Sequence, residues 1–463
     1  MSQNILLVIF DQLSAQALPS FGGWVNSAPH IESLAKNGLC FNRAYSNYPL
    51  CMPSRASFWS GRYPHQTGVI SNGRLHQNSE VGLETPTIGQ LLSEAGLDCV
   101  HFGKEHDAGA LHGFRRVQTD KVKLPSESGF PLNGDSYKDE ATTRAVCSWL
   151  DDGVEGPFCC AVDIQNPHNI CGWVGENRQG VDPSPVPEPL PELPVNLWDF
   201  DLENRPKPVQ YICCAHNRQG QSSHWDDEAW RRYRAAYEYY IGLADAHLAR
   251  ILDALKKNGK YDDTLIVLMA DHGDGMGHHG HATKHTSFYD QTTRIPLIVH
   301  GKGVDRKGAC DDLVSLVDLL PTLVDVAGGE LPEGLPGHSL LPAWREGADV
   351  GHGEVVSQWH TEWGFTVEPG RMLRTDRFKY CVYREEDGEE LYDMEQDPWE
   401  QRNLASDSNY QDVLENHRQT FKAYLEKSGD DFLSLDWKAD PRWREHAVGY
   451  SHHHGPAAPE AGS

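Results

Sequence analysis

Four continuous apolar runs constrain the fold of this sequence more than any other feature. They are NILLVIF (4–10), DCVHFG (98–103), FCCAVDIQ (158–165) and TLIVLMA (264–270). After each run comes a polar side chain that could take part in catalysis or metal binding. A run of this kind predicts a strand buried on both faces, as in a parallel sheet covered by helices. Open α/β sheets carry their sites at the carboxyl ends of such strands, so we expect the site there.

Helical patterns alternate with these runs. Residues 30–38 form a short amphipathic pattern that stops at Gly38, and residues 227–259 form a long one that stops at Gly259. A glycine directly after the last apolar position is a typical helix C-terminus. Alternating strands and helices predict an α/β fold in which helices cover both faces of the sheet.

The pattern changes after about residue 350. Residues 371–405 alternate like short antiparallel strands, with a turn at Asp387-Gly388, and a last helix is expected near 408–427. Residues 182–210, rich in proline and acids, are expected to form an extended surface excursion. The predicted organisation is a catalytic domain over 1–346, a smaller α+β subdomain with a small antiparallel sheet and a helix over 347–450, and a disordered tail over 451–463.

Charge and hydropathy exclude several classes of partner. The formal net charge is −26, and nucleic acids require clustered Lys and Arg, so we expect no nucleic-acid partner. No stretch approaches the roughly 20 apolar residues of a membrane span, so no membrane partner is expected. A small anionic ligand would need a locally positive pocket inside this acidic chain.

The N-terminus and the cysteines bear on the compartment. MSQNILLVIFDQ has no basic region before its apolar run, and it reads as a buried strand rather than a secretory signal. The 11 cysteines are an odd number without the spacing of a disulfide scaffold. We expect a cytoplasmic protein, with the periplasm as the alternative if a leader has been removed.

Acids and a histidine follow two of the apolar runs. Asp11-Gln12 and Asp271-His272 would meet at one edge of the sheet, where two carboxylates, an amide oxygen and an imidazole suit a divalent cation. The oxygen-rich set favours Ca²⁺ or Mg²⁺ over structural zinc. Each acid alone has an ordinary interpretation as a helix or turn cap, but the pair favours a metal.

The segment CMPSRASFWSG (51–61) has the features of a helix start. Pro53 and Ser54 suit the first turn, so Cys51 would lie at the N-terminus, where backbone N–H groups favour an anion. Arg55 follows one turn later and could reach the same point. A thiolate there would be a nucleophile, whereas the simpler interpretation is a helix-start cysteine with a surface arginine.

Cys51-Met52-Pro53-Ser54-Arg55, with Gly61 downstream, resembles the sulfatase signature Cys-x-Pro-x-Arg, which directs oxidation of the cysteine to formylglycine. Other motifs of that family follow in its order: NILLVIFDQ, GKEH, NPH, ADHGDGMGHHGHATK, TRIPLIV and LRTDRFKY…ELYDMEQDPWEQRNLA. From residue 4 to about 405, the chain resembles type I formylglycine-dependent sulfatases of the alkaline phosphatase superfamily.

The resemblance implies a mixed, mostly parallel central sheet flanked by helices, as in alkaline phosphatase. It implies a sulfuric ester hydrolase that releases sulfate from a small sulfated substrate, expected to be a carbohydrate O-sulfate. Cys51 would be a precursor, converted by a formylglycine-generating enzyme during maturation, and the hydrated aldehyde would be the nucleophile. A homo-oligomer is compatible with the sequence.

The resemblance also assigns residue roles. Arg55 would orient formylglycine, His106 would be the base and His168 the acid for the leaving oxygen. Positive charge from Lys104 and Lys284 would hold the sulfate. Ca²⁺, with Mg²⁺ or Mn²⁺ as alternatives, would be bound by Asp11, Gln12, residue 51, Asp271 and His272.

Some positions depart from the family pattern. Gln12 stands where a second acid is usual, Met52 replaces a small residue, and Glu105 stands where an aromatic residue is common. The spacing after Lys284 is one residue longer than is typical, so His285 competes with Lys284 for the same role.

Three interpretations of function stay open. Besides the sulfatase, the same nucleophile and metal would serve a phosphonate monoester or phosphodiester hydrolase, which Gln12 favours somewhat. A catalytically silent binding protein would retain Cys51 unoxidised.

Two groups of residues could contact substrate or simply pack in the core. They are the histidines His278, His279 and His281 and the tryptophans expected in irregular segments, Trp173, Trp225, Trp359 and Trp363.

Overall fold

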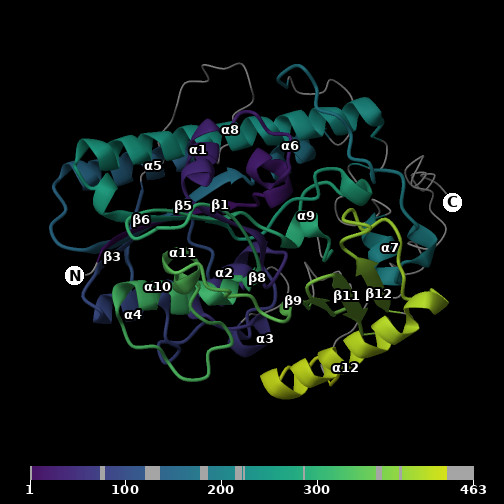
Figure 1. Cartoon of the computed structure of the whole chain (residues 1–463). Helices are drawn as coiled ribbons and strands as arrows, with labels where there is room; N and C mark the ends of the chain where they lie inside the picture. The colour runs from purple at the N-terminus through teal and green to yellow at the C-terminus, as the bar shows by residue number, and fades with distance from the viewer. Residues whose placement is uncertain are drawn as a thin grey trace.

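The computed structural model describes residues 3–72, 79–119, 136–177, 186–213, 222, 225–284, 287–360, 368–384 and 388–434. Its strands form two sheets (Figure 1). The larger has eight strands and is covered by helices on both faces, and a separate four-stranded sheet lies beside it. Within the described ranges, no helix combines the length and the apolar character needed to span a bilayer.

The larger sheet is mixed but mostly parallel, as predicted. β1 lies near its middle and pairs in parallel with β5 on one side and β6 on the other, whereas β7 runs antiparallel to β6 and β2. The strand order is β4 (Arg115–Val117), β3 (Asp98–Gly103), β5 (Phe158–Pro167), β1 (Asn4–Asp11), β6 (Thr264–Ala270), β7 (Leu297–Gly301), β2 (Leu39–Tyr45) and β8 (Gly308–Ser315).

Helices on both faces explain why the central strands are apolar throughout. All eight residues of β1 and all seven of β6 are buried. Figure 1 shows one helical layer above the sheet and another below it. The upper layer contains α1 (Pro29–Asn37), α5 (Ser136–Asp151) and α8 (Asp227–Lys257); the lower layer contains α2 (Cys51–Ser60), α4 (Ile88–Glu94) and α10 (Leu319–Ala327).

The long helix α8 brings two tyrosines toward the carboxyl edge of the sheet from the upper helical layer. Its N-terminus is capped by Asp226, whose carboxylate accepts the Ala229 N–H at 2.9 Å, and Lys256 and Lys257 lie in its last turn, where cations stabilise a helix. Tyr233 and Tyr237 lie on its buried face. The helix thus places two phenol groups against the residues that follow β1 and β6, since Tyr237 donates to the Gln12 carbonyl oxygen and Tyr233 to Asp274 Oδ1.

Short elements connect the main ones. The short helices are α3 (Pro64–Thr67), α6 (Ile170–Asn177), α7 (Lys207–Cys213), α9 (Asp290–Thr293) and α11 (Leu341–Arg345). The 3₁₀ turns are η1 (Ala15–Ala17), η2 (Pro19–Phe21), η3 (Leu202–Asn204), η5 (Tyr261–Asp263), η6 (His278–Gly280), η7 (Leu316–Asp318) and η8 (Ser408–Tyr410). Since η3 and the start of α7 fall inside the predicted excursion over 182–210, that stretch is partly helical rather than extended throughout.

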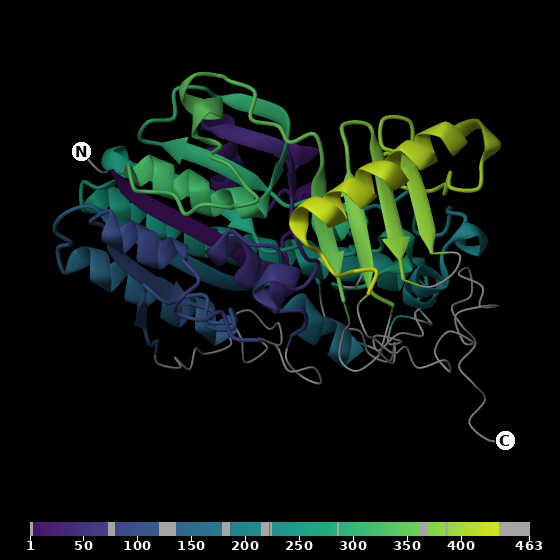
Figure 2. The same ribbon diagram turned by 90° about the horizontal axis from the view of Figure 1, so that it is seen from below.

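The C-terminal sheet is antiparallel and carries one long helix, as expected. Its order is β12 (Glu389–Asp393), β11 (Phe378–Tyr383), β10 (Gly370–Arg374) and β9 (Val355–Trp359). Helix α12 (Gln411–Ser428) lies across these strands (Figure 2). The domain boundaries stay predictions; Asp387 of the expected turn and the tail 451–463 lie outside the described residues.

Candidate active site

Four neighbouring strands end at the same edge of the larger sheet. β3, β5, β1 and β6 are adjacent and parallel, so the residues that follow them lie side by side. Lys104 follows β3, His168 follows β5, Asp11 ends β1, and Asp271 follows β6. The strand order therefore brings together candidates that are up to 260 positions apart in the chain.

Helix α2 approaches this edge with its N-terminus. Leu50 is extended and Cys51 is the first helical residue, as the sequence predicts. Ser54 Oγ and Ser46 Oγ both donate to the Asp271 carbonyl oxygen, at 2.6 and 2.7 Å. These two bonds attach the first turn of the helix, and the segment just before it, to the end of β6.

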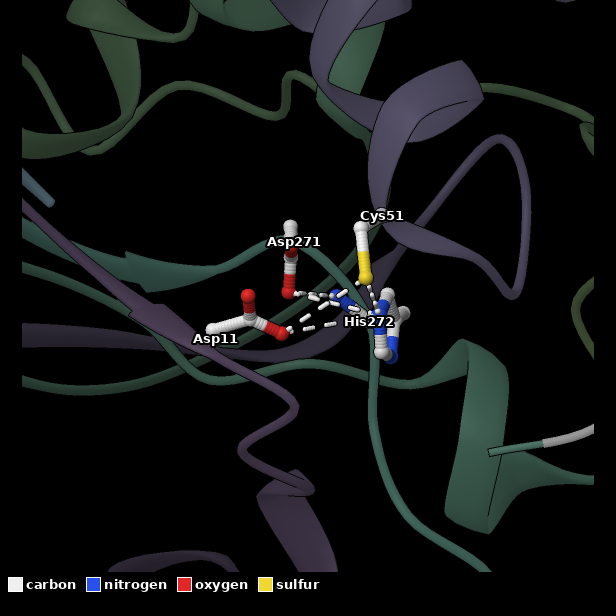
Figure 3. Close-up of side chains that lie close together, drawn as sticks. All are labelled: Asp11, Cys51, Asp271 and His272. Carbon is white, nitrogen blue, oxygen red and sulfur yellow. Dashed lines mark hydrogen bonds and ion pairs between the residues drawn. The ribbon is translucent and has the colours of Figure 1, made fainter. Parts of the chain in front are cut away.

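The side chains of Asp11, Cys51, Asp271 and His272 form a compact buried group (Figure 3). Each offers one ligand atom, and these atoms lie within 4.8 Å of one another. Cys51 Sγ lies 3.7 Å from Asp11 Oδ1 and 3.2 Å from His272 Nε2. Two carboxylates, an imidazole and the side chain at position 51 are a donor set that a divalent cation can use.

Gln12, the fifth predicted metal ligand, lies beside this group but is held by other contacts. Its N–H donates to Asp271 Oδ1 at 3.0 Å, and its backbone is left-handed with φ 71°. Its Nε2 donates to Asp274 Oδ2 at 2.7 Å, and Cys171 Sγ donates to its Oε1 at 3.5 Å. A role for Gln12 as a metal ligand stays a prediction.

Arg55 holds the acids in place from below. Its Nε donates to Asp271 Oδ2 at 2.9 Å, its Nη1 donates to Asp163 Oδ1 at 2.5 Å, and its Nη2 lies 3.8 Å from Asp11 Oδ2. The guanidinium is fully buried, and the acids raise its pKa well above the ordinary value although burial opposes this. The predicted contact of Arg55 with residue 51 stays a prediction.

Two lysines converge on the same point. Lys284 Nζ donates to Cys51 Sγ at 3.0 Å, and Lys104 Nζ donates to Asp11 Oδ2. The competing candidate His285 lies outside the described residues. The two ammonium groups place positive charge beside Cys51, whereas Arg55 pairs with Asp163 and Asp271.

Both predicted acid–base histidines lie near the thiol of Cys51, because His106 helps to lower the pKa of Cys51 and Cys51 partly offsets the lowering of the pKa of His168. His168 Nδ1 accepts from Gln165 Nε2 at 3.0 Å, so the neutral ring carries its proton on Nε2. His106 Nδ1 is buried and has no hydrogen-bond partner in the described part of the chain. Both rings are therefore placed to exchange protons with a group bound at position 51.

Cations dominate the electrostatics around Cys51. Burial alone raises the pKa of the thiol, but Lys104, Lys284 and His272 outweigh it and hold that pKa well below its ordinary value. The pKa of Asp11 is also lowered, because the positive charges outweigh both its burial and the repulsion from Cys51. The site therefore stabilises negative charge at position 51 and on a ligand beside it.

Several supporting residues escaped the sequence prediction. Asp163, inside β5, binds Arg55 and also accepts from His101 Nε2 at 2.8 Å. Asp139 on α5 accepts the N–H groups of Gln165 and Asn166 at 2.6 and 3.0 Å and so shapes the end of β5. Polar residues within apolar strands, as in CVHFG and AVDIQ, are the signal that could have revealed Asp163 and His101.

The histidines of the glycine-rich loop are buried. The ring of His278 stacks on Trp399 at 5.3 Å, and that of His279 stacks on Tyr289 at 3.8 Å. Burial lowers the pKa of both rings well below the ordinary value, with smaller contributions from nearby positive charges. His281 is buried as well. These surroundings favour packing over substrate contact.

The tryptophans pack rather than line an open surface. Trp173 lies in α6 and Trp359 ends β9, so the expectation that both lie in irregular segments is wrong. Trp173 and Trp225 contact each other edge to face at 6.0 Å, and Trp359 is fully buried. Trp363 lies outside the described residues.

Comparisons with known proteins agree with this geometry. Residues 3–329 match the family described as Sulfatase, and residues 277–427 match N-sulphoglucosamine sulphohydrolase, C-terminal. The chain is 43% identical to a Delta 4,5-hexuronate-2-O-sulfatase of Bacteroides thetaiotaomicron over 99% of this chain and 96% of that protein.

Solved structures give the same result. A structure of a 2-O GAG sulfatase is 42% identical, with a TM-score of 0.93 over 98% of this chain and 99% of that chain. A phosphonate monoester hydrolase of Agrobacterium radiobacter, 21% identical with a TM-score of 0.75 over 93% and 97% of the two chains, shares the fold alone. The resemblance drawn from the motifs is thus confirmed: the chain belongs to the sulfatase family and is a sulfuric ester hydrolase.

Proposed function

We propose that this protein releases sulfate from a carbohydrate O-sulfate, and that its substrate is a 2-O-sulfated, Δ4,5-unsaturated hexuronate at the end of a short oligosaccharide. The single observation that carries the chemistry is the convergence of Cys51 with two carboxylates, one imidazole and two lysines. The 43% identity to the Delta 4,5-hexuronate-2-O-sulfatase supports the substrate class.

The charges around position 51 suit one compact anion. Lys104, Lys284 and Arg55 are the cations there, and all three are largely removed from water, which strengthens their attraction for a sulfate group. The three cations lie close to one point and do not form an extended basic groove. This favours a sulfate on a terminal sugar over internal attack on a long polyanion.

We further propose Ca²⁺ as the resident cation, with Mg²⁺ and Mn²⁺ as alternatives, and formylglycine formed from Cys51. Asp11, Asp271 and His272 would hold the cation. The cation and the hydrated aldehyde would together supply the activated oxygen nucleophile. Ca²⁺ prefers oxygen donors, so oxidation at position 51 would improve the fit by replacing sulfur with oxygen, while His272 remains a nitrogen donor.

Proton transfer would fall to the two histidines. His168 would donate its Nε2 proton, as an imidazolium, to the oxygen that leaves with the sugar. Burial and the neighbouring Lys284 lower the pKa of His168, which makes the imidazolium a stronger acid. His106 would take a proton from position 51 so that sulfate can depart and leave the aldehyde, and addition of one water would restore the hydrated form.

A phosphonate monoester or phosphodiester hydrolase is the second candidate. Gln12 stands where the family usually has an acid, which reduces negative charge beside the anion, and the fold is shared with a phosphonate monoester hydrolase. A phosphoryl centre presents a tetrahedral anion similar to sulfate.

Turnover of defined substrates tests the proposal. Ion chromatography should detect sulfate from an unsaturated 2-O-sulfated disaccharide and much less from its 6-O-sulfated isomer. Nitrophenyl sulfate should be hydrolysed faster than nitrophenyl phenylphosphonate; the reverse order would establish the second candidate instead. Turnover of only the 6-O-sulfated isomer would contradict the proposed substrate and leave the sulfatase chemistry intact.

Mass spectrometry and chelation test the chemistry itself. The intact mass should show that an aldehyde oxygen has replaced the sulfur of Cys51, and Cys51→Ser should abolish turnover. A chelator should abolish turnover, and Ca²⁺ should restore it. Full activity of a chain that retains its thiol, or full activity in chelator, would contradict the proposed nucleophile or cation.

A further inference from the structure

A second group of metal-binding side chains lies away from the active site. Asp318, His338 and His352 each offer one ligand atom, and these atoms lie within 4.8 Å of one another. Asp318 ends η7 at the start of α10, His338 lies between α10 and α11, and His352 lies just before β9. Three separate segments of chain therefore meet at this point.

The backbone is shaped to bring these segments together. A Cβ atom at Gly337 would lie 2.5 Å from the Val317 carbonyl oxygen and 2.7 Å from Asp318 Oδ1, so only glycine permits this approach. The N–H of His338 then donates to Asp318 Oδ1 at 2.9 Å, and the N–H of Ser315 donates to Oδ2 at 2.8 Å. These bonds hold the buried carboxylate in one orientation.

The ring of His338 is oriented as a metal ligand usually is. Its Nε2 donates to the Val350 carbonyl oxygen at 2.8 Å, because a carbonyl can only accept. The neutral ring then has its lone pair on Nδ1. Metal-bound imidazoles commonly donate their second ring N–H to a backbone carbonyl in this way, which fixes the tautomer.

His352 completes the group. Its Nε2 lies 2.9 Å from both carboxylate oxygens of Asp318, and its ring centroid lies 4.1 Å from that of His338. The proton that His352 shares with Asp318 occupies the position a cation would take between the nitrogen and the carboxylate. His338 is exposed, so an ion can enter from solvent.

We propose that Asp318, His338 and His352 form a second cation site, selective for a transition metal such as Zn²⁺. Two imidazoles and one carboxylate are a donor set that Zn²⁺ uses, and three protein ligands leave one position for water. Zinc bonds of about 2.0–2.2 Å require these three side chains to adjust their positions around the ion. The ion would join α10 to the segment that leads into β9.

Spectroscopic titration with Co²⁺, which takes Zn²⁺ sites and absorbs visibly in them, tests this proposal. The background is the full chain with His452, His453 and His454 replaced by Ala, so that the C-terminal histidines do not contribute, and an excess of Ca²⁺ is present. We expect saturable Co²⁺ binding that His338→Gln and His352→Gln each weaken by about tenfold or more. Zn²⁺ should raise the melting temperature of the background protein and raise it less in both variants.

A matched control separates a metal site from an ordinary histidine–carboxylate pair. His30 Nδ1 lies 2.7 Å from Asp245 Oδ2 without belonging to the group, so His30→Gln should leave Co²⁺ binding unchanged. His338→Gln changes an exposed side chain and remains informative if His352→Gln fails to fold. No saturable Co²⁺ binding, or equal binding by the background and His338→Gln, would overturn the proposal.

Discussion

Lys379 Nζ donates to Asp290 Oδ1 at 2.6 Å and thereby joins the C-terminal sheet to α9. The same ammonium group lies 2.7 Å from Glu400 Oε1, and it is fully buried. Asp290 begins α9, whose carbonyl oxygens at Gln291 and Thr292 accept the N–H groups of residues 274 and 273. A buried ion cluster therefore supports the backbone next to Asp271 and His272.

Replacing this lysine should destabilise the protein strongly. In Lys379→Met, the carboxylates of Asp290 and Glu400 lose a buried cation, and breaking such a pair costs about 3–5 kcal/mol. Urea unfolding should show this loss. Lys302→Met is the control, because Lys302 pairs with Asp263 at an exposed site, and it should change the free energy of unfolding little. Equal stability of the two variants would contradict the structural role of Lys379.

Glu390 should make stability fall as the pH rises. Burial raises its pKa from 4.5 to about 7, although the nearby Arg205 opposes this. The folded state therefore holds a proton that the unfolded state releases, so the stability is fully present below pH 4.5 and is lost as the pH rises toward 7. One such group contributes roughly 3 kcal/mol across that window.

Glu390→Gln should remove this contribution. Its unfolding free energy, measured by urea at several pH values between 4.5 and 7, should decline by less than that of the unaltered protein. Glu389→Gln is the adjacent control: hydrogen bonds from Arg418 and Tyr380 outweigh its burial and lower the pKa of Glu389, so it should keep the full decline. Parallel curves for Glu390→Gln and the unaltered protein would refute the assignment.

Arg55→Lys should lower the affinity of the active site for its cation. A lysine carries its N–H groups on one nitrogen and cannot place one nitrogen beside Asp271 and another beside Asp163, so both acids lose their fixed orientation. We expect cation affinity to fall about 10- to 100-fold, measured by calorimetry and by the Ca²⁺ dependence of turnover. Arg62→Lys is the control, because Arg62 Nη1 donates to a backbone group, the Gly334 carbonyl oxygen, at 3.2 Å. This variant should leave the cation affinity and the Ca²⁺ dependence of turnover unchanged.

His168→Ala should affect substrates according to their leaving group. A sugar alkoxide needs a proton as it departs, whereas nitrophenolate does not, so sulfate release from the disaccharide should fall about 10²- to 10⁴-fold. Hydrolysis of nitrophenyl sulfate should fall much less. His106→Ala should slow both substrates alike if His106 acts after the alcohol has left. An equal loss on both substrates for His168→Ala would rule out its role as the acid.

Local patterns in the sequence predicted the main strands, the sheet edge and most of the candidate site. Apolar runs predict buried strands, and the carboxyl ends of parallel strands lie at one edge of the sheet. Asp11, Asp271, His168 and Lys104 could therefore be grouped without a structure. The start of a helix at Cys51 was readable because capping and proline preferences act within a few residues.

Only the tertiary structure decided which side chains support the site. Arg55 meets Asp163 across 108 positions and Lys379 meets Asp290 across 89, and no local pattern records such pairs. The side chain of Gln12 is likewise oriented by Asp274, which is 262 positions away. Sequence periodicity reports which face of a strand or helix is buried, whereas the partner of a buried charge depends on how distant segments pack, and that is set only when the whole chain folds.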